Sequence, residues 1–118
     1  MKRLTRSFSY AWQGLVYTWR TQPNFRAETI IGLLAVLFAA WLEVNIVPIL
    51  FLMLAVLSLE LINTAIEAVC DLAAPHAHPL AKTAKDTAAA AVLLAAIVSI
   101  LVGLLLFLPA ITDKLRLW

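Results

Sequence analysis

The sequence is short of charged residues. Of its 118 residues, 14% are charged and 64% are hydrophobic, whereas a soluble domain is about a quarter charged and about half apolar. The mean hydropathy of the whole chain is +0.94. These proportions exclude an ordinary soluble domain, and they predict an integral-membrane protein in which residues 1–118 form a single domain.

Several other residue types are also scarce. A single cysteine, Cys70, excludes an intrachain disulfide. Three glycines leave no glycine-rich loop and no GxxxxGK[ST] motif, which excludes the phosphate sites of P-loop proteins and protein kinases. The net charge of +2, without a basic run interleaved with aromatic residues, excludes nucleic acid as a partner. Residues 1–28 have no long apolar core, so we expect no cleavable signal peptide.

One long run without charge predicts a membrane helix near the C-terminus. Residues 88–111 are 24 positions without a charged side chain. At about 1.5 Å per residue, a helix of this length crosses a hydrocarbon core of about 30 Å. We expect the whole helix to cover residues 83–111.

Two shorter apolar runs predict a pair of membrane helices joined by a tight turn. Residues 29–42 and 46–59 are 14 residues each, which is too short to span a membrane. Extended through neighbouring polar residues to 24–43 and 46–71, both reach a sufficient length. The intervening "EVN" at 43–45 predicts a turn, because it is polar and Pro48 follows it near the start of the next run.

Residues 3–22 have a different pattern, which predicts a helix lying in the membrane interface. Apolar and aromatic residues recur every three or four positions along this stretch, and arginines occur between them. Pro23 suits the first turn of the helix that follows. The apolar residues of this pattern are Leu4, Phe8, Trp12, Leu15 and Trp19.

The distribution of basic residues predicts the orientation. Five of them precede the apolar run at 29–42, Lys82 and Lys85 lie between the runs at 46–59 and 88–111, and the turn at 43–45 has none. Because cytoplasmic loops carry an excess of Lys and Arg, we expect the N-terminus and the 68–86 loop to be cytoplasmic. Lys114 and Arg116 weaken this asymmetry without reversing it.

The second membrane helix ends in the segment "ELINTAIEAVCD", residues 60–71, which is rich in acids. Its polar residues share one face of a helix. A carboxylate inside a membrane is costly, so such a residue is a functional-site hypothesis by default. The alternative is that this face meets water or pairs with Lys82 and Lys85. The polar residues are Glu60, Asn63, Thr64, Glu67 and Asp71.

The loop that follows adds basic and imidazole side chains to the same edge of the membrane. An acid cluster that binds Mg²⁺ beside two lysines suits a nucleoside triphosphate, because the metal takes hard oxygen ligands and the ammonium groups bind phosphates. A zinc pair of His76 and His78 is the weaker interpretation, because no third soft ligand accompanies it. The side chains of this loop are His76, His78, Lys82, Lys85 and Asp86.

Two long motifs carry a resemblance. "SLELINTAIEAVCDL" at 58–72 and "HPLAKTAKDTAAAAVLL" at 78–94 resemble the prokaryotic diacylglycerol kinase/undecaprenol kinase family of small integral-membrane lipid kinases. The similarity extends from "SFSYAWQGL" at 7–15 through "FLPAI" at 107–111. It implies an all-α fold with an interfacial helix and three membrane helices, assembled as a homotrimer with composite sites in the bacterial inner membrane. It also implies transfer of phosphate from ATP, with Mg²⁺, to a lipid alcohol.

The resemblance assigns roles residue by residue. Glu60 matches the catalytic base, which takes the proton of the lipid hydroxyl, and Asn63 matches a residue that orients the carboxylate or the phosphate. Glu67 matches a Mg²⁺ ligand. The positions that match nucleotide contacts are Arg3, Tyr10, Gln22, Glu67, His76, His78, Lys85 and Asp86. Those that match the lipid entry are Trp12, Asn24, Phe25, Arg26, Glu28 and Glu60.

One position departs from the family pattern. The relatives have a metal-sharing glutamate where this chain has Gln22, in "RTQPNFRAE". An amide carbonyl is a weaker ligand than a carboxylate for a hard dication. The departure puts the second metal ligand in doubt: Glu28 or Asp71 compensates, or Mg²⁺ binds more weakly, or the activity is reduced.

Other functions remain open at this point. The acid face would also suit a pore or a small transporter that conducts cations or protons, and Gln22 would suit a degenerate kinase that survives as an assembly subunit. The lipid substrate is undecided as well. The segments "HPLAKTAKD" and "NTAIE" are closer to undecaprenol kinases, whereas Glu28 is closer to diacylglycerol kinases.

Overall fold

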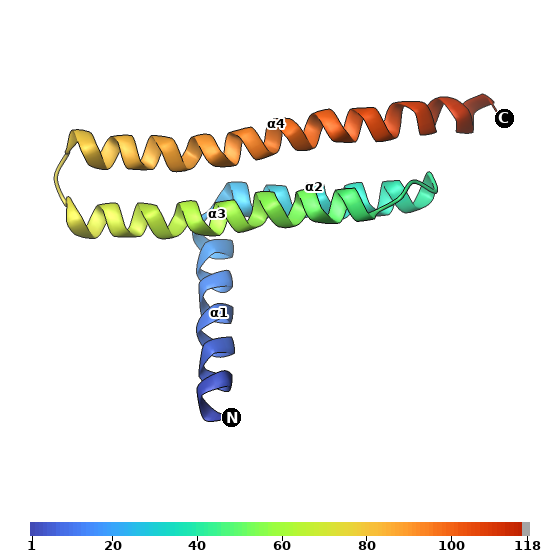
Figure 1. Cartoon of the computed structure of the whole chain (residues 1–118). Helices are drawn as coiled ribbons and strands as arrows, with labels where there is room; N and C mark the ends of the chain where they lie inside the picture. Colours follow the sequence, from blue (N-terminus) through green and yellow to red (C-terminus); the bar gives the residue numbers. More distant parts are fainter. Residues whose placement is uncertain (117–118) are drawn as a thin grey trace.

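The computed structural model describes residues 1–116, which form four α-helices (Figure 1). There is no strand in this part of the chain. The all-α prediction is therefore confirmed. The helices are α1 (Lys2–Thr21), α2 (Pro23–Trp41), α3 (Val47–Ala73) and α4 (Pro79–Arg116).

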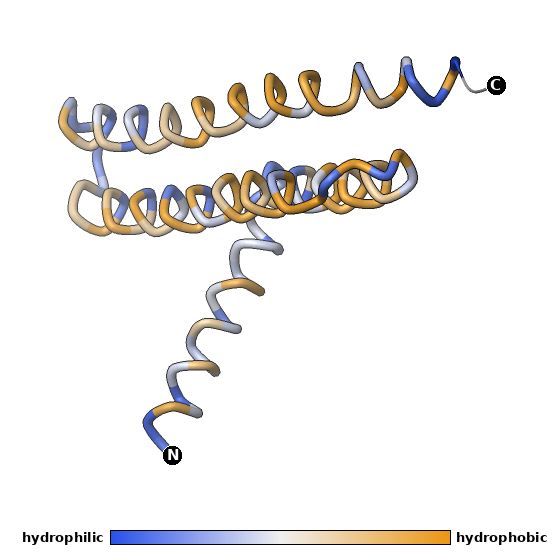
Figure 2. Tube along the Cα trace, turned by 45° about the vertical axis from the view of Figure 1, so that its right-hand side comes forward, coloured by the Kyte–Doolittle hydropathy of each residue, from blue (hydrophilic) through white to orange (hydrophobic). Residues whose placement is uncertain are grey.

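Three of the helices lie side by side, and the first projects away from them (Figures 1 and 2). α3 is central, because it contacts α1, α2 and α4. α2, α3 and α4 are each long and apolar enough to cross a membrane. Their outward surfaces are covered with exposed leucine, isoleucine and phenylalanine side chains. Apolar groups on the outside suit a hydrocarbon solvent, so the prediction of three membrane helices is supported.

The first three helices begin and end within two residues of the predicted positions, but α4 is longer than predicted at both ends. It begins at Pro79 rather than at 83 and continues to Arg116 rather than 111. Proline is favoured in the first turn because it has no N–H that needs a partner. Pro109 lies inside the helix without ending it. α4 therefore extends beyond the apolar run at both ends.

The corner between α1 and α2 is formed at Gln22. This residue is extended, with φ −114° and ψ 100°, and its N–H donates to the carbonyl of Thr18 at 2.9 Å. Pro23 then occupies the first turn of α2, as predicted. Two helices meet here with one residue between them, so the direction of α1 is fixed locally.

The side chain of Arg26 holds this corner together. Its Nη1 donates to the carbonyls of Trp19 and Arg20, at 2.7 and 3.2 Å, in the last turn of α1. A cation at a helix C-terminus satisfies carbonyls that have no partner within the helix, and it complements the helix dipole. The rings of Trp19 and Phe25 pack edge to face at 6.4 Å beside it. Arg26 and Phe25, expected at the lipid entry, thus lie at the corner.

A second cation closes the opposite end of the helix group. Lys114 of α4 donates from Nζ to the carbonyl of Trp41, the last residue of α2, at 2.7 Å. The same Nζ lies 4.3 Å from the centroid of the Trp41 ring, within the range of a cation–π interaction. Lys114, which weakened the charge asymmetry in the sequence, thus links α4 to the end of α2.

The turn predicted at 43–45 is confirmed, and it ends α2 with paired backbone bonds. The N–H of Val44 donates to the carbonyl of Ala39 at 2.9 Å, and that of Glu43 donates to Ala40 at 3.2 Å. This is the hydrogen-bond pattern of a Schellman motif, whose C′ residue has a left-handed backbone and is usually glycine. Here the C′ residue is Glu43, with φ 59°.

The left-handed backbone of Glu43 generates a stability prediction. We expect Glu43→Gly to raise the free energy of unfolding by about 0.5–1 kcal/mol, because glycine adopts this conformation without a Cβ clash. The thermal unfolding midpoint in detergent should rise by about 2–5 °C. Glu43→Ala is the control: it removes the carboxylate but keeps the strain. Equal stabilisation by alanine would show that charge, and not backbone strain, matters here.

Candidate active site

The polar face predicted on α3 lies partly inside the protein. Glu60 is 3% exposed, Thr64 6% and Asn63 8%. Glu67, two turns beyond Glu60, is half-buried, and Asp71 is exposed. The face therefore runs from the interior of the helix group to the end of α3 that joins the 74–78 loop.

Glu28 of α2 joins this face from the neighbouring helix. Its carboxylate is close enough to Glu60 for the two charges to interact, and Glu60 is likewise close to Glu67. Asn63 donates from Nδ2 to Oε1 of Glu67 at 3.4 Å. We call Glu28, Glu60, Asn63 and Glu67 the acid cluster. It collects three carboxylates and one amide within a membrane helix pair.

The acid cluster has more acceptors than donors. Within residues 1–116, two of its buried oxygens have no hydrogen-bond partner, Oε2 of Glu28 and Oδ1 of Asn63. A buried acceptor without a donor costs free energy, and neighbouring carboxylates add repulsion. The cluster therefore suits a ligand that brings protons, hydroxyl groups or a cation.

The oxygens of the cluster could supply some, but not all, of the ligands of a hard cation such as Mg²⁺. No group of three or more His, Cys, Asp or Glu side chains in residues 1–116 is arranged to hold a metal ion. Mg²⁺ is usually held by one or two carboxylates together with substrate phosphates and water. The half-buried Glu67 and the unpartnered Oδ1 of Asn63 offer oxygens of this kind. One chain thus offers protein oxygens for a metal whose other ligands would be phosphate and water.

Asp71, the last residue of the polar face, pairs with a lysine. This is the alternative that the sequence left open, in which the face meets water or pairs with Lys82 and Lys85. Lys85 of α4 donates from Nζ to Asp71 at 2.5 Å, and Lys82 donates to Asp86 at the same distance. Both pairs are exposed on the hairpin of α3 and α4, where ion pairs are weak and exchangeable. The carboxylate of Asp71 is therefore paired with Lys85. Of the two acids that could compensate for Gln22, Glu28 is the one that joins the buried end of the cluster.

His78 has a role in the fold that the sequence did not indicate. Its Nδ1 accepts the N–H of Leu80 at 3.1 Å, in the first turn of α4. The ring thus takes the place of the Ser, Thr, Asp or Asn that usually caps a helix. His76 is exposed in the loop before it. The zinc pair gains no third ligand in the described chain.

Residues of α1 stay apart from the acid cluster within one chain. The part of α1 that carries Arg3, Tyr10 and Trp12 projects away from α3 in both views (Figures 1 and 2). All three side chains are exposed. Gln22 is half-buried at the corner and Asn24 is exposed. The single chain therefore brings together Glu28, Glu60, Asn63 and Glu67, but not the expected contacts on α1.

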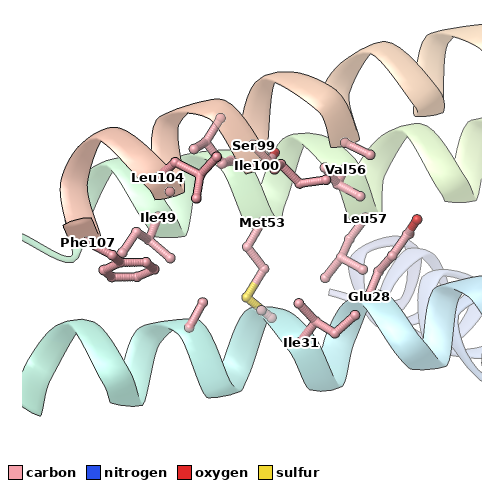
Figure 3. Close-up of a pocket in the computed structure, with 15 residues that line it drawn as sticks. Glu28, Ile31, Ile49, Met53, Val56, Leu57, Ser99, Ile100, Leu104 and Phe107 are labelled. Carbon is pink, nitrogen blue, oxygen red and sulfur yellow. The ribbon is translucent and has the colours of Figure 1, made fainter. Parts of the chain in front are cut away.

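An apolar groove beside the cluster was not anticipated. It has a volume of about 390 Å³ and lies between α2, α3 and α4, with Glu28 at one end (Figure 3). A glycine in each of two of the helices that line it, Gly32 in α2 and Gly103 in α4, was a weak signal in the sequence. Its lining consists of Glu28, Ile31, Gly32, Ala35, Ile49, Leu52, Met53, Val56, Leu57, Ala96, Ser99, Ile100, Gly103, Leu104 and Phe107.

The cap at His78 can be tested apart from any contact with a nucleotide. We expect His78→Ala to destabilise the protein by about 1 kcal/mol, because the N–H of Leu80 loses its acceptor. His78→Asn, which keeps a short acceptor, should retain most of the stability. Thermal unfolding in detergent measures both. Two variants with wild-type stability and equally weakened ATP binding would instead identify His78 as a nucleotide contact.

Comparison with known proteins bears on what the cluster does. The family model for prokaryotic diacylglycerol kinase matches residues 9–107. A diacylglycerol kinase of Synechocystis is 46% identical over 91% of this chain, and the match spans 63% of that longer protein. An undecaprenol kinase of Bacillus subtilis is 41% identical, over 92% of this chain and 91% of its own length.

A diacylglycerol kinase of Escherichia coli is 38% identical, over 84% of each chain. The match to the family model includes both motifs on which the resemblance was based. The relatives are named as kinases of two different lipids, diacylglycerol and undecaprenol. The chain belongs to the prokaryotic diacylglycerol kinase family, a family of lipid kinases.

Proposed function

We propose that the protein transfers the γ-phosphoryl group of ATP to the hydroxyl group of a membrane lipid alcohol. The observation that carries the proposal is Glu60, a carboxylate that is 3% exposed on a membrane helix. It interacts electrostatically with Glu28, whose Oε2 is buried without a partner in residues 1–116. Names of relatives from three organisms support the reaction class. The lipid oxygen forms a bond to the γ-phosphorus, the bond from that phosphorus to the bridging oxygen of ADP breaks, and the carboxylate of Glu60 takes the lipid proton.

Glu60 is the proposed general base. It lies on the apolar helix that the lipid can reach from the membrane, and its burial excludes bulk water as the competing nucleophile. A positioned base contributes about 10²–10⁴-fold to the rate of such a step. Asn63, one turn away, donates from its amide to Glu67, and its own oxygen is buried without a hydrogen-bond partner in residues 1–116, so it can accept from a ligand.

Glu67 and Gln22 are the proposed holders of Mg²⁺. When bound with ATP, the metal neutralises charge on the transferring phosphate, which is most of what such a reaction asks of its catalyst. Glu67 supplies a carboxylate, whereas Gln22 supplies a neutral carbonyl. We therefore propose a metal site weaker than that of relatives with glutamate at this position.

We propose that the remaining nucleotide contacts come from more than one chain. Lys85, Asp86, His76 and His78 lie at the hairpin of α3 and α4, whereas Arg3 and Tyr10 lie on α1, away from it. A homotrimer would bring α1 of one subunit to the hairpin of another, and it would cover apolar surface at the same time. We propose such composite sites, with α1 in the membrane interface.

The proposed orientation places ATP on the cytoplasmic side of the bacterial inner membrane. The basic residues of α1 and of the α3–α4 hairpin are the charged groups that the cytoplasmic face favours. Either undecaprenol or a diacylglycerol is the lipid alcohol, since relatives are named for both. Trp12, Asn24 and Glu28 are proposed to lie along its entry.

The first prediction concerns Glu60. Glu60→Gln should abolish phosphoryl transfer, by about 10²-fold or more, because an amide cannot accept the proton. ATP binding should stay near the wild-type value, since the carboxylate does not contact the nucleotide. Transfer of radiolabelled phosphate to undecaprenol and to diacylglycerol, each supplied alone in membranes, measures it. Glu43→Gln, the same change in an exposed turn, is the control, and a retained turnover in Glu60→Gln above one tenth of wild type would refute the assignment.

The second prediction concerns Gln22. Gln22→Glu should lower the Mg²⁺ concentration for half-maximal activity about five- to thirtyfold, because ligand charge raises the affinity for a hard cation. Gln13→Glu, the same change at an exposed position of α1, should leave the Mg²⁺ titration unchanged. Glu28→Gln should also leave it nearly unchanged. A large shift in Glu28→Gln without one in Gln22→Glu would move the metal to Glu28.

A further inference from the structure

The apolar groove between α2, α3 and α4 runs away from the acid cluster. Its far end lies at Ile49 and Phe107, and Glu28 lies at its near end (Figure 3). Ile49 and Leu57 are eight residues apart on α3, so the groove is about 12 Å long. The hydroxyl of Ser99 donates to the carbonyl of Ala95 in its own helix. Apart from Glu28, the lining therefore offers no unsatisfied polar group.

The two ends of the groove match the two parts of an amphiphile. Oε2 of Glu28 is buried and has no partner within residues 1–116, so it requires a donor such as a hydroxyl group. Val56 lines the groove one turn before Glu60 on α3, about 6 Å along the helix axis. A molecule with a hydroxyl group at the cluster and a hydrocarbon chain in the groove would satisfy the carboxylate and cover the apolar walls.

A close contact narrows the groove at its middle. Met53 points from α3 toward α2 (Figure 3), where it lies on Gly32. A Cβ added to Gly32 would come within 2.8 Å of both Cγ and Sδ of Met53. Only glycine at this position lets the thioether lie against the backbone of α2. Methionine is unbranched and adaptable, so its position depends on the space that Gly32 leaves.

We propose that the groove binds one hydrocarbon chain of the lipid alcohol, and that Met53, seated on Gly32, sets the width of chain that it accepts. The inference rests on the proposed kinase function and specifies where the substrate's chain lies. A cavity of about 390 Å³ lined by apolar side chains, with one carboxylate at its end, has the size and character of a ligand site. Met53 acts on substrate choice through shape alone.

The test compares two diacylglycerols with the same head, one with straight saturated chains and one with methyl-branched phytanoyl chains. Met53→Ala removes three heavy atoms from the groove and should raise the ratio of kcat/KM for branched over straight chains about tenfold. Gly32→Ala displaces Met53 into the groove and should lower the same ratio about tenfold. Leu54→Ala, an exposed neighbour on α3 outside the groove, should leave the ratio unchanged.

The double variant separates this proposal from a general loss of packing. The three atoms nearest to a Cβ added on Gly32 all belong to the side chain of Met53 beyond Cβ. Gly32→Ala should therefore have little effect once Met53→Ala is present, and the double variant should have the ratio of Met53→Ala. Independent, additive effects of the two substitutions, or equal effects on both lipids, would overturn the proposal.

A second measurement does not depend on turnover. A diacylglycerol with a diazirine in one acyl chain, irradiated in vesicles that contain the wild-type protein, should label Met53, Leu57 and Ile100. Labelling confined to exposed residues such as Leu54 would overturn the proposal. It would indicate instead that a helix of a second copy of the chain fills the groove. Wild-type protein that phosphorylates no lipid alcohol would refute the kinase function, whereas the label still reports whether the groove holds a chain.

Discussion

The structure depends on how carboxylates are kept inside a membrane helix pair. Glu60 is almost fully buried on α3, with Glu28 opposite on α2 and Glu67 two turns along the same helix. No cation of the described chain forms an ion pair with them, and repulsion among them is not cancelled locally. Such an arrangement lowers stability unless protons, hydroxyl groups or a metal with phosphate are supplied from outside. The acid cluster thus suits a ligand that supplies one of these groups.

The rest of the fold holds this cluster in place from two ends. Arg26 binds the last carbonyls of α1 and fixes the corner from which α2 starts, two residues before Glu28. Lys114 binds the last carbonyl of α2 at the other end. Both cations act on helix termini, where unpaired carbonyls and the helix dipole favour them. With its two ends held, α2 keeps Glu28 level with Glu60, and its glycine faces Met53.

The two ends of the polar face of α3 have different surroundings. The buried end of the polar face meets the apolar groove, where a lipid chain is proposed to lie. The exposed end meets the hairpin, where Lys85 is held by Asp71 in a surface ion pair that a phosphate can replace. One helix therefore carries the proposed base, Glu60, at its buried part and the exposed Asp71 at its end.

The sequence by itself determined the helices, because hydropathy and proline positions act locally: the spans, the turn at 43–45 and the start of α2 at Pro23 all follow from it. It also determined the polar face of α3, since helical periodicity places Glu60 and Glu67 together. Only the tertiary structure decided that Glu28 joins them, that Asp71 pairs with Lys85, and that His78 caps α4. Each of these contacts depends on distances set by packing or by the exact backbone at a helix end, which no sequence spacing encodes.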